Sequence, residues 1–383
     1  MSRPRKVAYA TGSRADYGIV RRYLGLLDAD SSVDLTVLAT ASMLDERFGA
    51  PVSLVESDGF AIGARILLPL GDDGSEGVAR AMAVALEGFA RVFASNRPDL
   101  LVILGDRYEM LSVATAAAMA RIPILHLHGG EATYGNYDEF IRHAITKMSL
   151  YHITSADPYR KRVIQLGEAP ERVWCLGSLG VENCLFDAAE PHESWVESLP
   201  EDGFAVVLFH PETASGLEPR HQVEEMLRAL DAVPELPLVV IGPNADTGAS
   251  ALRRGLGELC ERRENARWCE NLTPATYHAL LRRGGLLVGN SSSGIIEAPS
   301  LGAWTVNIGA RQAGRVRGES VIDVPCESGI IVGAISEALE RPRFSGTNPY
   351  FYPDASKAYL ETTLGILDRL AVDSSKPKVF WDL

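Results

Sequence analysis

The chain has 383 residues, of which 46% are hydrophobic and 23% charged, as in ordinary globular proteins. This composition excludes a disordered chain, a fibre and a coiled-coil rod, and the length predicts two or three domains. The 37 Lys and Arg residues against 50 Asp and Glu residues give a net charge of −13, so the chain is poorly suited to bind nucleic acid or anionic lipid.

The cysteines and the apolar segments indicate the compartment. The five cysteines form no CxxC pair, which disfavours a disulfide framework and a four-thiolate zinc site and favours free thiols in a reducing cytosol. The N-terminus meets Arg14 and Asp16 soon after a short apolar run, unlike a signal peptide. The longest uncharged apolar stretch, near Met110–Ala120, is shorter than the ~20 residues of a membrane span. We therefore expect a soluble cytoplasmic protein.

Short apolar runs alternate with longer helical patterns in the first half of the chain. Strands are predicted at Val7–Ala10, Val33–Thr40, Leu100–Leu104 and Ile122–Leu127, and helices at Gly18–Leu27, Val78–Phe93, Met110–Arg121 and Tyr137–Leu150. This strand–turn–helix order is typical of a parallel sheet covered by helices on both faces.

A polar, Pro-containing segment, Asp187–Gly203, interrupts this order and is predicted to link two domains. Beyond it, strands are predicted at Phe204–Phe209, Leu238–Ile241, Leu286–Val288 and Trp304–Ile308, and a last helix at Ser356–Leu370 has no strand after it. We therefore expect two doubly wound, Rossmann-like α/β domains, residues 1–185 and 186–355, with a ligand cleft between them.

Two segments are candidates for binding an anion. TGSRADYG (Thr11–Gly18) lacks the glycines of a dinucleotide fingerprint, but Arg14 at a strand-to-helix turn can hold a phosphate; alternatively it is an exposed turn residue. GNSSSG (Gly289–Gly294) places three serines at the start of a predicted helix, Gly294–Leu301, where a diphosphate can bind. Glu297 can then accept hydrogen bonds from ribose hydroxyls, whereas a serine-capped helix is the structural alternative.

Carboxylates and histidines gather behind the strands of the first half. Asp106 follows a wholly apolar strand, and HLHGGEATYGNYDEFIRH holds Glu131 and Asp138. Two carboxylates with imidazoles at strand ends suit proton transfer at carbon, whereas ion pairs to Arg107 and Arg142 and compensation of a helix dipole are the structural alternatives. Strand alternation predicts that the side chains of His126 and His128 share one face, but neither has a third ligand at a spacing typical of a metal site.

Taken together, these segments resemble the hydrolysing UDP-N-acetylglucosamine (UDP-GlcNAc) 2-epimerases of sialic acid biosynthesis, and most closely the bacterial capsule branch. The resemblance spans nearly the whole chain, in blocks such as TGSRADYGIVRR, GDRYEMLSVA, HLHGGEATYGNYDEFIRH, HPET and GNSSSGIIEAPSLG. It implies a GT-B-like fold with the C-terminal helix, about 356–383, packed on the N-terminal domain. It also implies a UDP-sugar substrate and neither cofactor nor metal, and we expect a homodimer or higher homo-oligomer.

The resemblance also implies roles for single residues. Catalysis would involve Asp106, Glu131, Asp138, His128 and His210, the last facing the first domain across the cleft. The UDP-sugar would be bound by Arg14, Arg107, Asn244, Ser291, Ser292, Ser293, Gly294, Glu297 and Arg311. Many relatives carry Glu before the glycine pair where this chain has His128, and Glu131 is the nearest carboxylate that can replace it.

The implied reaction begins with loss of UDP from C1, after which a carboxylate removes the C2 proton and leaves a glycal. Addition of water at C1 and return of a proton to the other face of C2 give N-acetylmannosamine. Two carboxylates with separated pKa values can share these steps. The alternatives are the same reaction on a UDP-2,4-diacetamido-trideoxy sugar on the way to legionaminic acid, a retaining glycosyltransferase, and a non-enzymatic nucleotide-sugar sensor.

Overall fold

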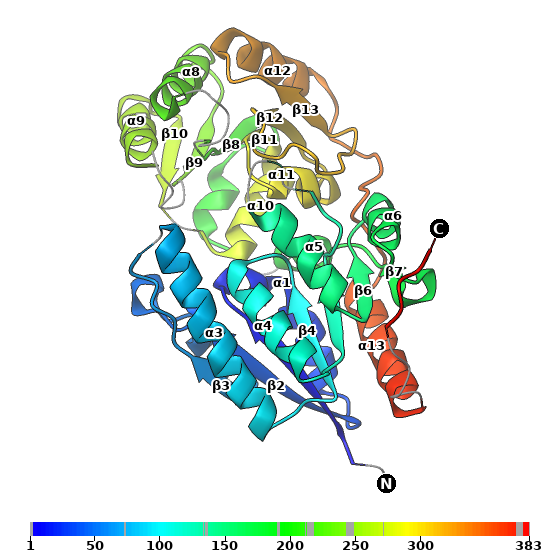
Figure 1. The fold of residues 1–383 in the computed structure, drawn as a ribbon. Helices are drawn as coiled ribbons and strands as arrows, with labels where there is room; N and C mark the ends of the chain where they lie inside the picture. The colour runs from blue at the N-terminus through cyan, green and yellow to red at the C-terminus, as the bar shows by residue number, and fades with distance from the viewer. Residues whose placement is uncertain are drawn as a thin grey trace. The chain divides into compact units, whose positions relative to one another are not determined.

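The computed structural model describes residues 3–72, 74–132, 134, 137–189, 192–210, 212, 218–242, 249–270, 272–372 and 378–382 (Figure 1). The chain packs as two compact units. The first unit comprises Met1–Glu131, Asn136–Leu179 and Tyr352–Leu383, and the second comprises Ala132–Gly135 and Gly180–Phe351. The sequence-based boundaries, 1–185 and 186–355, remain predictions about independently folding domains.

The first unit is built on a parallel sheet whose seven strands, within the described residues, run in the order β3-β2-β1-β4-β5-β6-β7. The strands are β1 Arg5–Thr11, β2 Val33–Thr40, β3 Ile62–Ile66, β4 Leu100–Leu104, β5 Ile124–Leu127, β6 Tyr151–Thr154 and β7 Val173–Cys175. The helices are α1 Arg14–Asp28, α2 Val52–Ser57, α3 Ser75–Ser95, α4 Tyr108–Met119, α5 Asp138–Met148, α6 Asp157–Gln165 and α13 Ala355–Val372. The helix α7 Leu179–Asp187 starts at the last residue of the segment Asn136–Leu179 and otherwise belongs to the second unit.

Helices cover both faces of this sheet, which explains why β4 is a continuous apolar run. Leu100, Val102 and Leu104 belong to the core beneath α1 and α13, while Leu101 and Ile103 belong to the core beneath α3, α4 and α5. A strand buried on both faces needs an apolar side chain at every position. The predicted doubly wound arrangement is therefore confirmed for this unit.

The C-terminal helix α13 packs against α1 of the first unit. The hydroxyl groups of Tyr23 and Thr363 are hydrogen-bonded at 2.8 Å, and the rings of Tyr23 and Tyr359 meet edge to face with centroids 5.7 Å apart. The Tyr359 hydroxyl donates to the carbonyl of Gly177 at 2.7 Å. The last helix of the chain thus completes a core formed largely by the first 180 residues.

The second unit repeats the design with a parallel sheet whose six described strands run in the order β10-β9-β8-β11-β12-β13. The strands are β8 Phe204–Leu208, β9 Leu238–Ile241, β10 Ala266–Cys269, β11 Gly285–Gly289, β12 Trp304–Ile308 and β13 Val321–Val324. The helices are α8 Pro219–Asp231, α9 Ala249–Arg262, α10 Pro274–Gly284, α11 Ser293–Ile296 and α12 Ser328–Glu340.

The helix predicted at Gly294–Leu301 is wrong, because the structure has two short turns there. Instead of a continuous helix over Gly294–Leu301, the structure has the single turn α11 followed by a 3₁₀ turn, Ala298–Leu301. Pro299 supplies no N–H to the helical ladder and its ring opposes the carbonyl four residues earlier, so an α-helix cannot run through it. In the described part of the chain no helix is long and apolar enough to cross a membrane.

Candidate functional site

Each sheet reverses its strand order at one point, and the predicted site residues lie there. In the first unit β1 and β4 are neighbours although their chain connections leave in opposite directions, so the loops holding Arg14 and Asp106 flank this point. In the second unit β8 and β11 are the corresponding neighbours, followed by His210 and Ser291. Ligands of doubly wound sheets bind beyond the carboxyl ends of the strands at such switch points.

Arg142 organises the carboxylates of the first unit. Its side chain is only 1% exposed, and it donates to Asp106 Oδ2, to Glu139 Oε2 at 2.9 Å and to the carbonyl of Glu131 at 2.8 Å. A guanidinium group can serve several acceptors at once because its N–H groups form a rigid planar fork. α5, whose first turn is acidic, is thereby tied to the loops after β4 and β5.

The structure corrects the expected ion pairing of Arg107. The Asp106 carboxylate pairs with Arg142, whereas Nε of Arg107 donates to Oε1 of Glu109. Glu109 is fully buried in the first turn of α4, so the guanidinium group of Arg107 is paired with a buried carboxylate. Arg107 keeps its side chain partly exposed, as a residue that contacts an anionic ligand requires.

Asp138 is the first residue of α5 and is half-buried. Burial and the nearby Asp106 carboxylate raise the pKa of Asp138 to about 6, although Arg142 and Arg107 act to lower it. A carboxyl group with such a pKa exchanges its proton readily near neutral pH. The structure therefore brings Asp106, Arg107 and Asp138 into one electrostatic cluster.

Asp16 and Glu109 also belong to this cluster, and the sequence analysis did not single them out. Burial raises the pKa of Asp16 to about 6; Arg107 and Ser13 lower it, while Glu109 and Asp106 raise it. Gly12 lies against Glu109, and a Cβ at this glycine would come within 2.4 Å of Glu109 Oε1. Each carboxylate lies in a motif that follows a strand, so a search of every acidic residue in those motifs would have found both.

The histidines behind β5 differ from the expectation. β5 ends at Leu127 and His128 has a φ of +61°, so strand alternation does not extend to His128. His126 is fully buried, with Nε2 2.8 Å from the carbonyl of Gly105 and Nδ1 3.1 Å from the hydroxyl of Thr146, and burial lowers its pKa to about 3. His126 is thus a neutral structural residue.

Glu131 is buried at the end of the glycine loop. Its Oε1 accepts a hydrogen bond from the hydroxyl of Ser155 at 2.6 Å and lies 3.6 Å from Nδ1 of His128. Through the main-chain contact of Glu131 with Arg142, this carboxylate is positioned by the same cation that pairs with Asp106. Arg142 therefore binds the Asp106 carboxylate and the main chain of Glu131 and acts electrostatically on Asp138.

In the second unit, Asn290 holds the loops after β8 and β11 together. Its side chain accepts a hydrogen bond from the His210 N–H and donates one to the His210 carbonyl, both at 2.8 Å. Its own carbonyl accepts from the Arg311 guanidinium at 3.3 Å, while the Arg311 N–H donates to Glu212 Oε1 at 2.9 Å. His210 and Arg311 are therefore brought together by an asparagine that the sequence analysis did not select.

The serine loop is fixed by short side-chain hydrogen bonds. The hydroxyl groups of Ser291 and Ser293 are 2.8 Å apart, and the hydroxyl of Tyr277 lies 2.6 Å from that of Ser293. Ser292 is the N-cap residue of α11. Gly294 is required for packing, since a Cβ there would approach Thr305 Cγ2 to 2.6 Å. The loop is thus held rigidly at the carboxyl end of β11.

Glu297 has a cationic partner that sequence reasoning missed. Its Oε2 lies 3.3 Å from Nε2 of His278, whose Nδ1 lies 3.2 Å from Oδ2 of Asp187. Burial acts to lower the pKa of His278, but the two carboxylates outweigh it and raise the pKa to about 9. His278 is therefore protonated at neutral pH and anchors Glu297. The remaining predicted residue, Asn244, lies outside the described residues.

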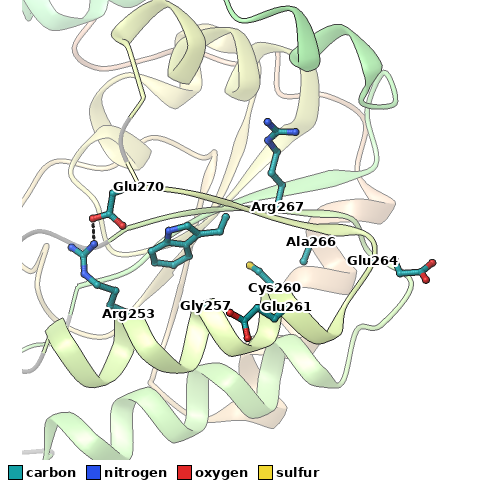
Figure 2. A pocket seen from close by; sticks show the side chains of 9 residues that line it. Arg253, Gly257, Cys260, Glu261, Glu264, Ala266, Arg267 and Glu270 are labelled. Carbon is teal, nitrogen blue, oxygen red and sulfur yellow. Dashed lines mark hydrogen bonds and ion pairs between the residues drawn. The ribbon is translucent and has the colours of Figure 1, made fainter.

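Two pockets are lined by residues of the second unit. One of about 620 Å³ lies between α9 and the edge strand β10, where Arg253 and Glu270 form an ion pair and Arg267 points away from them (Figure 2). It contains none of the predicted site residues. The other, of about 490 Å³, is lined by Glu212 and by Gly309 at the end of β12, next to the segment that holds Arg311.

Comparison with known proteins relates this geometry to a family. A family model for UDP-N-acetylglucosamine 2-epimerase matches residues 26–363. The polysialic acid biosynthesis protein P7 of Escherichia coli is 42% identical over 360 residues, which cover 92% of this chain and 91% of that protein. The hydrolysing UDP-N,N'-diacetylbacillosamine 2-epimerase of Legionella pneumophila is 34% identical over 349 residues, 90% of this chain and 92% of that protein.

The fold is also similar to that of a solved enzyme structure. The crystal structure of UDP-GlcNAc 2-epimerase from Neisseria meningitidis bound to UDP-GlcNAc matches with a TM-score of 0.79 at 16% identity, covering 94% of this chain and all of that one. The expected fold class, two Rossmann-like α/β domains of the GT-B kind, is thereby confirmed. Since the family model spans most of the sequence, the chain belongs to the UDP-N-acetylglucosamine 2-epimerase family.

Proposed function

We propose that this protein is a hydrolysing UDP-GlcNAc 2-epimerase that releases UDP and N-acetylmannosamine for sialic acid biosynthesis. The observation that carries the proposal is the cluster at the carboxyl edge of the first sheet, where Asp106 is bound by Arg142 next to Asp138, whose pKa is raised to about 6. Carboxylates held in place at different pKa values are what removal and return of a carbon-bound proton require.

In this proposal the second unit binds the nucleotide. Ser291, Ser292, Ser293, Gly294 and Arg311 contact the diphosphate, and Glu297, anchored by His278, accepts hydrogen bonds from the ribose. Arg14, Arg107, His210 and Asn244 complete the binding of the UDP-sugar. Cations and main-chain N–H groups at the diphosphate stabilise the negative charge that develops as UDP leaves C1.

The first unit then carries out the proton transfers. As positive charge builds at C1, one of Asp106, Glu131 and Asp138 removes the C2 proton, which yields 2-acetamidoglucal. Water adds to C1, and a second group returns a proton to the opposite face of C2. His128, close to Glu131, orients or tunes that carboxylate.

A second candidate differs only in the sugar. The relative from Legionella pneumophila, 34% identical, is a hydrolysing UDP-N,N'-diacetylbacillosamine 2-epimerase, which supports the same reaction on a UDP-2,4-diacetamido-trideoxy sugar. The 42% identical relative from Escherichia coli is a polysialic acid biosynthesis protein, which supports UDP-GlcNAc as the substrate. We favour UDP-GlcNAc because of this higher identity.

Incubation of the protein with each UDP-sugar in deuterated water, followed by NMR of the products, tests the proposal. We expect release of UDP and of N-acetylmannosamine that carries deuterium at C2. Preferential turnover of the diacetamido sugar would select the second candidate. Transfer to an added acceptor without deuterium at C2 would instead identify a glycosyltransferase, and binding without turnover a sensor.

A further inference from the structure

The C-terminal segment Lys378–Asp382, here called the C-terminal strap, lies against the first unit beyond α13. Nζ of Lys378 donates to the carbonyl groups of Lys147 at 2.8 Å, Ser149 at 2.5 Å and Thr146 at 3.3 Å. These carbonyls belong to the end of α5, where an α-helix leaves its last C=O groups without partners inside the helix. A lysine at this end also interacts favourably with the helix dipole.

The same ammonium group reaches a buried carboxylate. Glu168 is 2% exposed and lies 2.7 Å from Lys378, 2.7 Å from Lys147 and 3.1 Å from Nε2 of His152. Burial acts to raise the pKa of Glu168, but hydrogen bonds from His152, Lys147 and Lys378 outweigh it and lower the pKa to about 2. Because a buried charge must be paired, Lys378 shares the compensation of the Glu168 carboxylate with Lys147 and His152.

Two aromatic residues give the strap a defined seat. The main-chain N–H of Trp381 donates to the carbonyl of Gly167 at 3.0 Å. The Phe380 ring packs directly on this glycine, so that a Cβ at Gly167 would come within 2.3 Å of the ring. Gly167 has a φ of +85°, and Nζ of Lys147 lies 4.8 Å from the centroid of the Phe380 ring. The strap is therefore fixed by main-chain, apolar and cation–π contacts.

Helix α5 connects the strap to the candidate catalytic cluster. Its first turn carries Asp138, and Arg142 follows one turn later, whereas Lys378 binds its last turn. With a rise of about 1.5 Å per residue, the six residues from Arg142 to Met148 span only about 9 Å. A shift at the end of so short and stiff a helix moves Arg142 and Asp138 with it.

A second buried connection runs beside the helix. The hydroxyl of Thr146, near the end of α5, lies 3.1 Å from Nδ1 of His126, whose Nε2 lies 2.8 Å from the carbonyl of Gly105, the residue before Asp106. His126 is paired in register with His152 of β6, the partner of Glu168. The helix and this chain of hydrogen bonds both connect Glu168, which Lys378 binds, to Asp106, which Arg142 binds.

We propose that the C-terminal strap is a positioning element that holds α5 in the register in which Arg142 and Asp138 serve the reaction. Lys378 is its central positioning residue and acts through the helix. The catalytic part of this inference rests on the proposed function of the same cluster. Because Phe380 is 62% and Trp381 42% exposed, the strap adds little to the hydrophobic core, and its effect is expected to be local.

The test replaces Lys378 and follows both catalysis and the helix. In Lys378→Met, kcat for the UDP-sugar should fall by about 10- to 100-fold, the scale for a small misplacement of catalytic groups. KM should stay within about 2-fold because most of the proposed UDP contacts lie in the second unit and none of them is on α5. Hydrogen exchange of the peptide covering 138–150 should become faster in its last turn. Phe380→Ala should change the same quantities less.

Two further variants separate positioning from general stability. Lys378→Arg, which keeps the charge and several donors, should recover most of kcat and of the exchange protection. Lys357→Met removes an exposed lysine of α13 and should behave as the wild type. Wild-type kcat and wild-type exchange in Lys378→Met would overturn the proposal, and so would equal losses in Lys378→Met and Lys357→Met.

The hydrogen-exchange measurement tests the strap independently of the proposed function. If the wild type turns over neither UDP-sugar, the proposed function fails, and with it the catalytic role of the strap. The exchange measurement then still decides whether Lys378 holds the end of α5. If the wild type is active and hydrogen exchange in Lys378→Met is unchanged, the strap does not position α5, and the proposed function still stands.

Discussion

Arg142 and Asp106 form an ion pair at the carboxyl edge of the first sheet, although 36 residues separate them in the chain. The guanidinium group is buried and also binds Glu139 and the main chain of Glu131. A single cation thus sets the relative positions of the loop after β4, the glycine loop after β5 and the first turns of α5. In the proposed reaction this geometry decides which carboxylate reaches the C2 proton.

Replacing Arg142 is expected to abolish turnover. Arg142→Lys keeps the charge but loses the planar fork, so kcat should fall at least about 100-fold while UDP affinity stays unchanged. Arg142→Met leaves the half-buried carboxylates of Asp106 and Glu139 without their cation, and its free energy of unfolding should fall by about 1–3 kcal/mol. Steady-state kinetics, calorimetric titration with UDP and urea denaturation measure these effects.

The matched control is Arg91→Met, which removes an arginine whose pair with Glu87 is exposed on α3. It should leave turnover and stability unchanged, because exposed ion pairs contribute little. Wild-type turnover in Arg142→Lys would show that the fork geometry is not needed for the reaction.

The carboxylates themselves are tested by their amides. Asp106→Asn, Glu131→Gln and Asp138→Asn keep the shape of each side chain and remove its proton chemistry. Each should still bind UDP and lose at least about 100-fold in turnover. NMR of deuterium at C2 assigns the roles, since a variant with near-normal incorporation has lost no proton-transfer group. If all three behave so, His128 and His210 become the leading candidates.

The serine loop is expected to bind the diphosphate. The double variant Ser291→Ala, Ser292→Ala should weaken UDP binding by about 1–3 kcal/mol, the scale for hydrogen bonds to charged groups. Calorimetric titration with UDP measures the loss. Ser198→Ala, at an exposed position of the same unit, is the control and should bind UDP normally. Equal affinities of the double variant and the control would exclude the loop from the nucleotide site.

His278 is expected to make stability depend on pH. Its folded-state pKa of about 9 lies above the ordinary value of 6.5, so its contribution is complete below pH 6.5 and is lost as the pH rises through 9. His278→Gln should therefore reduce the fall in the free energy of unfolding between pH 6.5 and 9, measured by urea denaturation at several pH values.

His192→Gln provides the comparison, because His192 is half-buried and its partner Glu197 is exposed. This variant should keep the pH dependence of the wild type. A wild-type slope in His278→Gln would mean that the pairing with Asp187 and Glu297 does not stabilise the folded protein.

Much of the fold could be predicted because the central strands are wholly apolar. LLVIL at Leu100–Leu104 favours a strand covered on both faces, and the four strands predicted in each half are all present. The short strands β3, β6, β7, β10 and β13 were not predicted. β10 lies at a sheet edge and carries Arg267 and Trp268, so it has no continuous apolar pattern to recognise.

The sequence by itself determined that the polar motifs follow predicted strands. Because the carboxyl ends of parallel strands meet at one edge of a sheet, these motifs are expected to gather at that edge. The sequence therefore placed Asp106, Glu131 and Asp138 near one another, and His210 near Ser291. Only the tertiary structure decided the pairing: Arg142 with Asp106, Glu109 with Arg107, His278 with Glu297, and Lys378 with Glu168. Ion pairs form between side chains that folding brings within a few ångströms and buries together, and sequence spacing carries no record of that distance.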